Sequence, residues 1–156
     1  MKIRSLLFLL LSLLVLPCLA DPYKAGETIE VFSAKDQHQK AYTLEPKNTR
    51  YLLVSHDMET GKAANKVLDG LGADYLPGKK AIYMANIHGM PGIGRMFALP
   101  KMRKYAHRII LGDDAELIAH FPQQAGKVTV LKLSGKKIVS IQYWDPAKEA
   151  PGTYLP

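Results

Sequence analysis

The chain has almost no cysteine. Its 156 residues include one, Cys18, and that residue lies in a segment with the pattern of a removable export signal. Once residues 1–20 are removed, no thiol remains in the chain. This excludes disulfide bonds, thiol–disulfide exchange and cysteine-dependent peroxide reduction for the mature protein. Its stability must then come from packing and not from covalent crosslinks.

A long hydrophobic run is also missing. The main apolar stretch, Leu6 to Leu16, follows two basic residues and precedes a short segment that ends at Ala20. A membrane-spanning helix needs about 20 apolar residues, so this shorter stretch is typical of a signal peptide. We predict cleavage after Ala20, a periplasmic or secreted protein, and no transmembrane segment in the mature chain. Lipid attachment at Cys18 is an alternative, but Pro17 fits that processing poorly.

Charge of one sign is not concentrated anywhere in the sequence. The chain has 21 Lys and Arg against 14 Asp and Glu, and removal of residues 1–20 leaves a net charge of +5. The densest basic points are Lys79-Lys80, Lys101 to Lys104 and Lys136-Lys137, with acidic residues between them. Nucleic-acid binding requires a concentrated basic patch. We therefore expect a solvated basic surface and no nucleic-acid partner.

Hydrophobic patterns outside the signal predict alternating strands and helices. We expect a break at Pro77-Gly78 after the first helix, and a kink or division at Pro100 in the second. The alternation favours an α/β fold with parallel central strands, and the closing hairpin makes the sheet mixed. In chain order we expect strand Glu27–Phe32, strand Lys40–Leu44, strand Arg50–Ser55, helix Gly61–Tyr75, strand Lys80–Asn86, helix Gly92–Tyr105, strand Arg108–Leu111, helix Asp113–Phe121, strand Lys127–Leu133 and strand Lys137–Trp144.

Two stretches resemble the thioredoxin-like superfamily. GETIEVFSAKDQHQKAYTL, followed by RYLLVSHD, is similar to the start of peroxiredoxins and exported thiol–disulfide reductases. HRIILGDDAELIAHFPQQAGKVTVLKLSGKKIV is similar to their second half. The resemblance covers residues 26–144. It implies a single thioredoxin-like domain over residues 21–156, with a mixed sheet flanked by helices and an N-terminal β-hairpin extension.

The chain departs from this family at its reactive site. The family's cysteine lies where the first core strand gives way to a helix, because a helix N-terminus lowers the pKa of a thiol. The corresponding window, His56 to Ala63, has no cysteine. The family's cis-proline would fall near Val128, and cis bonds are essentially confined to proline. The resemblance therefore implies a redox-inactive member.

Loops that follow parallel strands are where open α/β sheets bind ligands. Two such loops have unusual sequences, HDMETGK at residues 56–62 and IHGMPGIGR at residues 87–95. They follow neighbouring predicted strands, so we expect them to face each other. Asp57 and Glu59 also suit ordinary roles at a helix start. Arg95 would add positive charge to a glycine-rich, anion-binding turn, although GMPGIGR lacks the dinucleotide spacing. The ligand-binding candidates in these two loops are His56, Asp57, Met58, Glu59, Lys62, His88, Met90 and Arg95.

Three functions remain open at this stage. The first is a redox-inactive binding protein without a cofactor, whose partner is an unknown protein or small ligand of the cell envelope. The second is copper handling, because imidazole and thioether ligands suit cuprous copper. The third is a cysteine-independent or flavin-associated oxidoreductase, although no serine elbow or carboxylate pair supports an enzyme. The four copper-ligand candidates are His56, Met58, His88 and Met90.

The other methionines have a structural explanation. Met84 lies in a predicted strand, and Met96 and Met102 are spaced as one face of a predicted helix, so we expect all three in the core.

The C-terminal segment differs from that of the family. After Trp144, three prolines break any long helix, whereas thioredoxins usually close with a packed helix. Either this tail folds back over its own core, or it leaves an aromatic face that includes Tyr154 open to a partner.

Overall fold

The computed structural model describes residues 20–156, so the predicted signal peptide and Cys18 lie outside the described part apart from Ala20. Within that part, no helix has the length and apolar character needed to cross a membrane. The elements are β1 (Ser33–Asp36), β2 (Ala41–Thr43), β3 (Tyr51–Ser55), α1 (Met58–Leu71), α2 (Tyr75–Gly78), β4 (Ala81–Asn86), α3 (Gly92–Met102), β5 (Ile110–Gly112), α4 (Ala115–Ala119), β6 (Val128–Ser134), β7 (Lys137–Trp144) and the 3-10 turn η1 (Pro151–Thr153).

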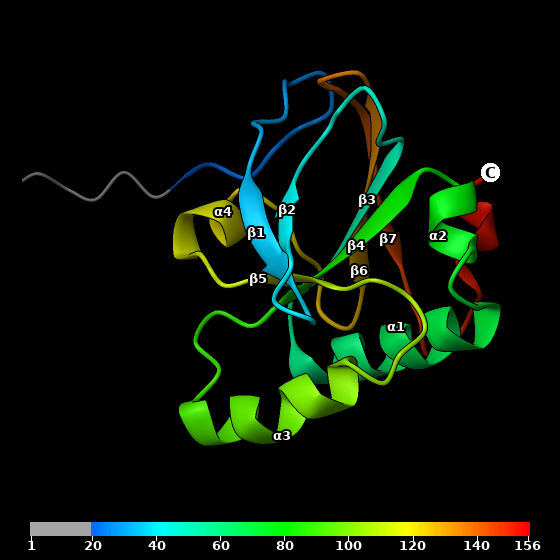
Figure 1. The fold of residues 1–156 in the computed structure, drawn as a ribbon. Coiled ribbons are helices and arrows are strands. Elements are labelled where there is room, and N and C mark those ends of the chain that lie inside the picture. The colour runs from blue at the N-terminus through cyan, green and yellow to red at the C-terminus, as the bar shows by residue number, and fades with distance from the viewer. Residues whose placement is uncertain (1–19) are drawn as a thin grey trace, which may run out of the picture.

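The strands form one mixed sheet in the order β2-β1-β5-β4-β3-β6-β7 (Figure 1). The three central strands, β3, β4 and β5, are parallel, as their buried patterns predicted. β6 and β7 form the closing hairpin, and the β1–β2 hairpin extends the opposite edge through β5. The predicted α/β fold class, with its N-terminal hairpin extension, is confirmed.

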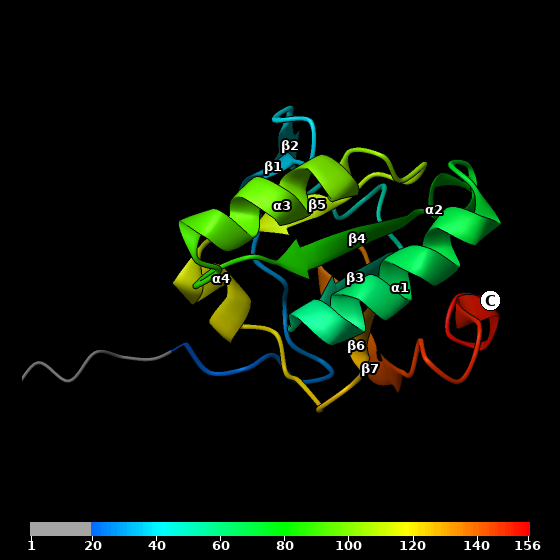
Figure 2. The same ribbon diagram turned by 90° about the horizontal axis from the view of Figure 1, so that it is seen from below.

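Each face of the sheet has its own core. On one face, Leu53 and Tyr83 of the central strands are buried together with Ala64 and Leu68 of α1. On the other face, Met84 and its neighbours pack with the N-terminal segment and α4. Figure 2 shows α1 and α3 side by side over β4, on the same side of the sheet. The end of β4 therefore lies beneath the space between two helices that are distant in the sequence.

Helix α1 begins and ends at residues suited to those positions. The Asp57 side chain caps its first turn by accepting a hydrogen bond from the Thr60 backbone N–H at 2.8 Å. At the other end, Gly72 adopts a φ of +88°, which favours glycine and stops the helix. The prediction of a helix up to Tyr75 was therefore too long. Pro77-Gly78, expected to terminate this helix, lie inside the separate helix α2.

The first predicted strand was wrong in position. Residues 27–32 make only an isolated bridge through Thr28, and β1 runs from Ser33 to Asp36, directly after the predicted strand and through most of the polar segment 34–39 that was expected to be a turn. Polar side chains make this possible, because Asp36 is buried while it accepts hydrogen bonds from the His38 and Lys40 backbone N–H groups at 2.8 and 3.0 Å. Buried polar groups with partners carry no large penalty. Hydropathy alone therefore misplaced this strand.

The C-terminal tail folds back over the core, which is the first of the two alternatives. Leu155 and Trp144 are fully buried. The Trp144 indole N–H donates to the Glu149 carbonyl at 2.8 Å, and the Tyr154 hydroxyl donates to the Glu149 carboxylate at 2.6 Å. A single 3-10 turn thus occupies the end of the chain in place of a long helix.

Helix α3 is continuous through Pro100 and does not divide there. The missing proline N–H affects one bond near the C-terminal end, and the Arg103 N–H still bonds to the Leu99 carbonyl at 3.1 Å. None of the residues of α3 is buried. Met96, predicted to lie in the core, is 70% exposed, whereas Met84 is buried as expected.

Candidate functional site

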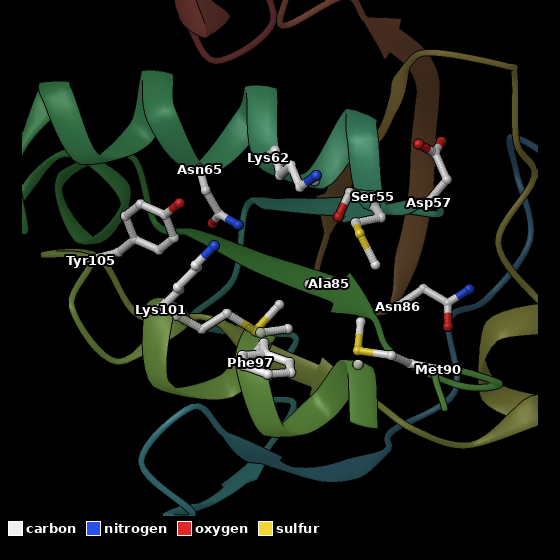
Figure 3. A pocket seen from close by; sticks show the side chains of 15 residues that line it. Ser55, Asp57, Lys62, Asn65, Ala85, Asn86, Met90, Phe97, Lys101 and Tyr105 are labelled. Atoms are coloured by element: carbon white, nitrogen blue, oxygen red, sulfur yellow. The ribbon is translucent and has the colours of Figure 1, made fainter. Parts of the chain in front are cut away.

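A groove of about 250 Å³ lies between α1 and α3. Ser55 at the end of β3, together with Ala85 and Asn86 of β4, forms its floor (Figure 3). One face of α1 and one face of α3 form its two walls. The lining residues on each helix recur at intervals of three or four positions, which is the spacing of one helical face. On α1 these are Met58, Gly61, Lys62 and Asn65, and on α3 Gly94, Phe97, Ala98, Lys101 and Met102.

The two ends of the groove differ chemically. Met90 lies at the end where α3 begins, and its thioether points back into the groove, beside the polar Asp57 and Asn86 (Figure 3). At the other end, the Lys101 ammonium points across toward Asn65, beside the Tyr105 hydroxyl (Figure 3). Phe97 lies between the two, so an apolar middle section adjoins an end rich in hydrogen-bond donors.

Apolar surface continues from the groove over α3. Ile93, Met96 and Phe97 are 70%, 70% and 66% exposed, and Phe97 also lines the groove. Large apolar side chains gathered on one exposed helix face are uncommon unless something covers them.

Arg95 holds the beginning of α3 in place. Its guanidinium makes two bonds to the Asp113 carboxylate, at 2.5 and 2.6 Å, and also donates to the Ile87 and Met90 carbonyls at 3.1 Å. This pairing raises the pKa of Arg95, and the same pairing lowers the pKa of Asp113. Arg95, predicted to bind an anionic ligand, thus already holds an anion from its own chain.

A buried polar layer lies beneath the groove. The Ser55 and Tyr83 hydroxyls share a hydrogen bond of 2.8 Å, and burial raises the pKa of Tyr83. The His107 Nε2–H donates to the Asn65 Oδ1 at 2.9 Å, and burial lowers the pKa of His107 to about 4. Both pairs are neutral near pH 7, so the ionised groups of the groove lie in its walls.

The first predicted loop contributes three residues to the groove. Asp57, Met58 and Lys62 line it, whereas Glu59 is exposed and pairs with Lys62 at 2.8 Å. Asp57 serves as the predicted helix cap. Partial burial opposes ionisation of this carboxyl, but the hydrogen bonds from the Thr60 N–H and hydroxyl outweigh it, so the pKa of Asp57 is lowered.

His56 faces a different part of the molecule. The Thr129 hydroxyl donates to the Pro122 carbonyl at 2.5 Å, so its oxygen accepts the Nε2–H of His56 at 2.9 Å. The opposite ring nitrogen, Nδ1, is buried and has no partner in residues 20–156. Burial lowers the pKa of His56, which keeps the ring neutral near pH 7.

Asn86 joins the two predicted loops. Its amide donates to the His56 carbonyl at 3.2 Å and accepts from the His88 backbone N–H at 2.9 Å. The loops therefore lie next to each other, as their position after neighbouring parallel strands implied. Of the four copper-ligand candidates, Met58 and Met90 line the groove, and neither histidine is among the lining residues. Across the described residues, no three His, Cys, Asp or Glu side chains are grouped closely enough to hold a metal.

Several groove residues were not identified from the sequence. Asn65, Phe97 and Lys101 lie on α1 and α3 beyond the loops, and the signal that could have found them is their helical spacing on two separate helices. That spacing was interpreted only as core packing. Other missed lining residues include Ala85 of β4 and Tyr105, which follows α3.

No protein-family model matches the chain, and no curated protein matches it by sequence. Solved structures do match it in fold. The thioredoxin domain of thiol-disulfide oxidoreductase BVU-2223 from Bacteroides vulgatus has 13% identity and a TM-score of 0.54, over 86% of this chain and 99% of that one. Peroxidoxin BcpB from Mycobacterium tuberculosis has 13% identity and a TM-score of 0.52, over 77% and 85%.

A peroxiredoxin-like protein from Aquifex aeolicus matches with 9% identity and a TM-score of 0.52, over 80% of this chain and 78% of that one. Identities this low establish the fold alone. The fold is thioredoxin-like, as the resemblance implied, and residues 20–156 contain no cysteine that could act in it.

Proposed function

We propose that this protein is an exported, redox-inactive thioredoxin-like binding protein whose ligand lies in the groove between α1 and α3. The observation that carries the proposal is the exposed apolar face of α3 beside that groove. Small-molecule sites are concave and mostly apolar, with a few placed polar groups. The apolar wall with Phe97 and the donor-rich end with Lys101 fit that description.

The two walls supply different parts of such a site. Ala64, Asn65 and Leu68 of α1 are buried against the sheet, so this wall is fixed. α3 has no buried residue and keeps Phe97 available for contact. Covering apolar surface contributes roughly 25 cal/mol per Å². A ligand in the groove would gain this energy from α3 without disturbing the core.

Export rests on the sequence of the first 20 residues. The short apolar run after two basic residues supports a signal peptide, and a domain without thiols is compatible with an oxidising compartment. The ligand would then be met in the periplasm or outside the cell. Mass spectrometry of the protein isolated from its host tests this step, because cleavage after Ala20 gives a chain that begins at Asp21.

The groove is tested with a neutral apolar dye, N-phenyl-1-naphthylamine, whose fluorescence rises on transfer from water. We expect binding by residues 21–156 and at least about tenfold weaker binding by Phe97→Ser, since truncation of an apolar contact of this size removes roughly 1.4 kcal/mol or more. Val139→Ser is the control, because Val139 is an exposed apolar residue of β7 that does not line the groove. Equal affinities for the two variants would refute the site.

Copper handling is the second candidate, and the shared groove position of the Met58 and Met90 thioethers favours it. Thioethers are ligands that cuprous ion prefers. If copper is the ligand, the double variant Met58→Leu, Met90→Leu loses cuprous ion in competition with a chelator, and Met96→Leu keeps it. The double variant His56→Ala, His88→Ala shows whether imidazoles take part. Unchanged metal affinity in both double variants would rule copper out at this site.

A further inference from the structure

The donor-rich end of the groove contains an amide that is positioned by a partner on its far side. Asn65 is 4% exposed, and its Oδ1 accepts the Nε2–H of His107 at 2.9 Å. This bond fixes the orientation of the amide, because Oδ1 is committed to His107 and Nδ2 remains as the donor end. Asn65 lines the groove. An amide donor held in one orientation at a groove can bind an acceptor group of a ligand.

Lys101 brings positive charge to the same place. Its side chain reaches from α3 toward Asn65, and the Tyr105 hydroxyl lies beside them (Figure 3). Within residues 20–156, no carboxylate lies within ion-pair distance of Lys101. An ammonium, an amide N–H and a hydroxyl together form a donor set for an anionic oxygen group.

The other charged lining residues do not compete for this position. Lys62 pairs with Glu59 at 2.8 Å. Asp57 lies at the opposite end of the groove, where its carboxylate accepts two hydrogen bonds from Thr60 at 2.7 and 2.8 Å. The unpaired charge of the groove is therefore positive and lies at the donor-rich end, while Phe97 and Met90 provide apolar contact between that end and Asp57.

Size narrows the choice of occupant. A groove of about 250 Å³ lies just below the usual range for small-molecule sites, roughly 300–1,000 Å³. This space suits a single apolar chain better than a folded peptide. Because the groove is open to solvent between two helices, a longer chain can extend beyond it over α3.

We propose that the ligand is a single-chain amphipathic carboxylate, with the carboxylate at Asn65, Lys101 and Tyr105 and the alkyl chain over Phe97 and Met90. This inference rests on the proposed function, because it assigns a chemical class to the occupant of the same groove. The protein is then a carrier or receptor for a fatty-acid-like molecule.

The test compares three molecules with the same ten-carbon chain: decanoate, decanol and decylamine. Displacement of N-phenyl-1-naphthylamine from residues 21–156 measures the affinity of each molecule, with decanoate and decylamine kept below their micelle concentrations and decanol below its solubility limit. We expect decanoate to bind at least about tenfold more tightly than decanol, because charge-assisted hydrogen bonds exceed neutral ones by a margin of this order. Decylamine should bind most weakly, since its ammonium meets Lys101.

Single variants locate the carboxylate. Lys101→Met should reduce decanoate to the affinity of decanol while leaving decanol unchanged, and Tyr105→Phe should weaken decanoate by a smaller factor. Lys104→Met is the matched control, an exposed lysine that does not line the groove. Added salt should weaken decanoate and not decanol.

The outcomes separate the ligand class from the groove itself. If the dye and decanol bind but decanoate has no advantage, or keeps its advantage in Lys101→Met, the carboxylate assignment is wrong and the groove remains a site. If a short apolar peptide with a free carboxyl end binds more tightly than decanoate, the occupant is a peptide and this assignment is also wrong. If neither the dye nor any of the three molecules binds, the proposed function fails together with the inference.

Discussion

The two helices that form the groove lie on the same face of the sheet but are stabilised differently. α1 has a side-chain cap at Asp57 and five buried residues, among them Leu68. α3 begins at Pro91 without a side-chain cap, has no buried residue, and exposes Phe97 and Met96. One helix is part of the core, and the other rests at the edge of it.

This difference separates the residues that stabilise the fold from those available to a ligand. The apolar face of α1 is buried in the core, whereas α3 has an exposed apolar face that the fold does not bury. Arg95 holds α3 through exposed polar contacts that need no burial of its apolar side chains. Substitutions in the two helices should therefore separate stability from binding.

The largest contrast is expected between core and groove residues. Leu68→Ala, at a site 1% exposed, should lower the free energy of unfolding by about 2–5 kcal/mol, because it removes transfer energy and leaves a cavity. Phe97→Ala, at a site 66% exposed, should change it by no more than about 0.5 kcal/mol. Urea denaturation measures both. Similar losses would show that α3 belongs to the core after all.

Acid should weaken the contact between the two regions. His107 lies in the segment after α3 and bonds to Asn65 of α1, and burial lowers its pKa to about 4 from 6.5. Between these values the unfolded state binds the proton and the folded state does not, so stability is complete above pH 6.5 and falls toward pH 4. The loss is at most about 3 kcal/mol.

Unfolding followed by urea from pH 7.5 to 4 measures this loss. The lowered pKa of His56 adds to it in the same direction. His107→Gln should flatten the profile, and His38→Gln, an exposed histidine in a turn, should leave it unchanged. A profile that keeps its full slope in His107→Gln would show that the histidine is not the group responsible.

Removal of the α1 cap should have an intermediate effect. Asp57→Ala leaves the Thr60 N–H without its acceptor and should lower stability by about 1 kcal/mol, within the range of 0.5–2 kcal/mol for such caps. Pro91→Ala at the start of α3 removes no side-chain hydrogen bond and should lower stability less. Thermal unfolding of the two variants compares these losses. A larger loss of stability in Pro91→Ala than in Asp57→Ala would contradict the conclusion that α1 is the more strongly stabilised helix.

The smallest effect is expected to be local to α3. Arg95→Met removes the bonds to Asp113 and to two backbone carbonyls. We expect faster amide hydrogen exchange across α3 with little change across α1, because exchange reports local opening. Asp113→Asn, which keeps the carbonyl bonds, should give a weaker version of the same change. Equal acceleration in both helices would mean that the pair stabilises the whole fold.

The sequence was informative wherever one segment could be interpreted by itself. Runs such as residues 50–55 predicted buried parallel strands, and Asp57 was identified as a helix-start residue and acts as a cap. β1 was missed because Asp36 is polar but buried, and its partners include the Arg108 guanidinium, 72 residues away, as well as nearby backbone N–H groups.

The groove was missed for a related reason. The apolar spacing of α3 matches that of a core helix, and only the tertiary arrangement shows that Met96 and Phe97 are mostly exposed to solvent. Likewise, nothing in the sequence distinguishes Asn65 from other polar residues of a helix. Only the tertiary structure brings His107 to its Oδ1 and directs Lys101 toward it across the groove. A site made by two helices 20 or more residues apart leaves no local pattern in either of them.

The Asp57 cap has a consequence for protein engineering. Cysteines in place of Met58 and Gly61 would restore the spacing of a thioredoxin motif at the start of α1. A thiolate there needs the free N–H groups of the helix end, yet the Asp57 carboxylate already accepts the Thr60 N–H and adds a negative charge of its own. The new thiol would keep a high pKa and react slowly. Conversion of this scaffold into an oxidoreductase therefore requires the loss of Asp57 as well as the gain of two cysteines.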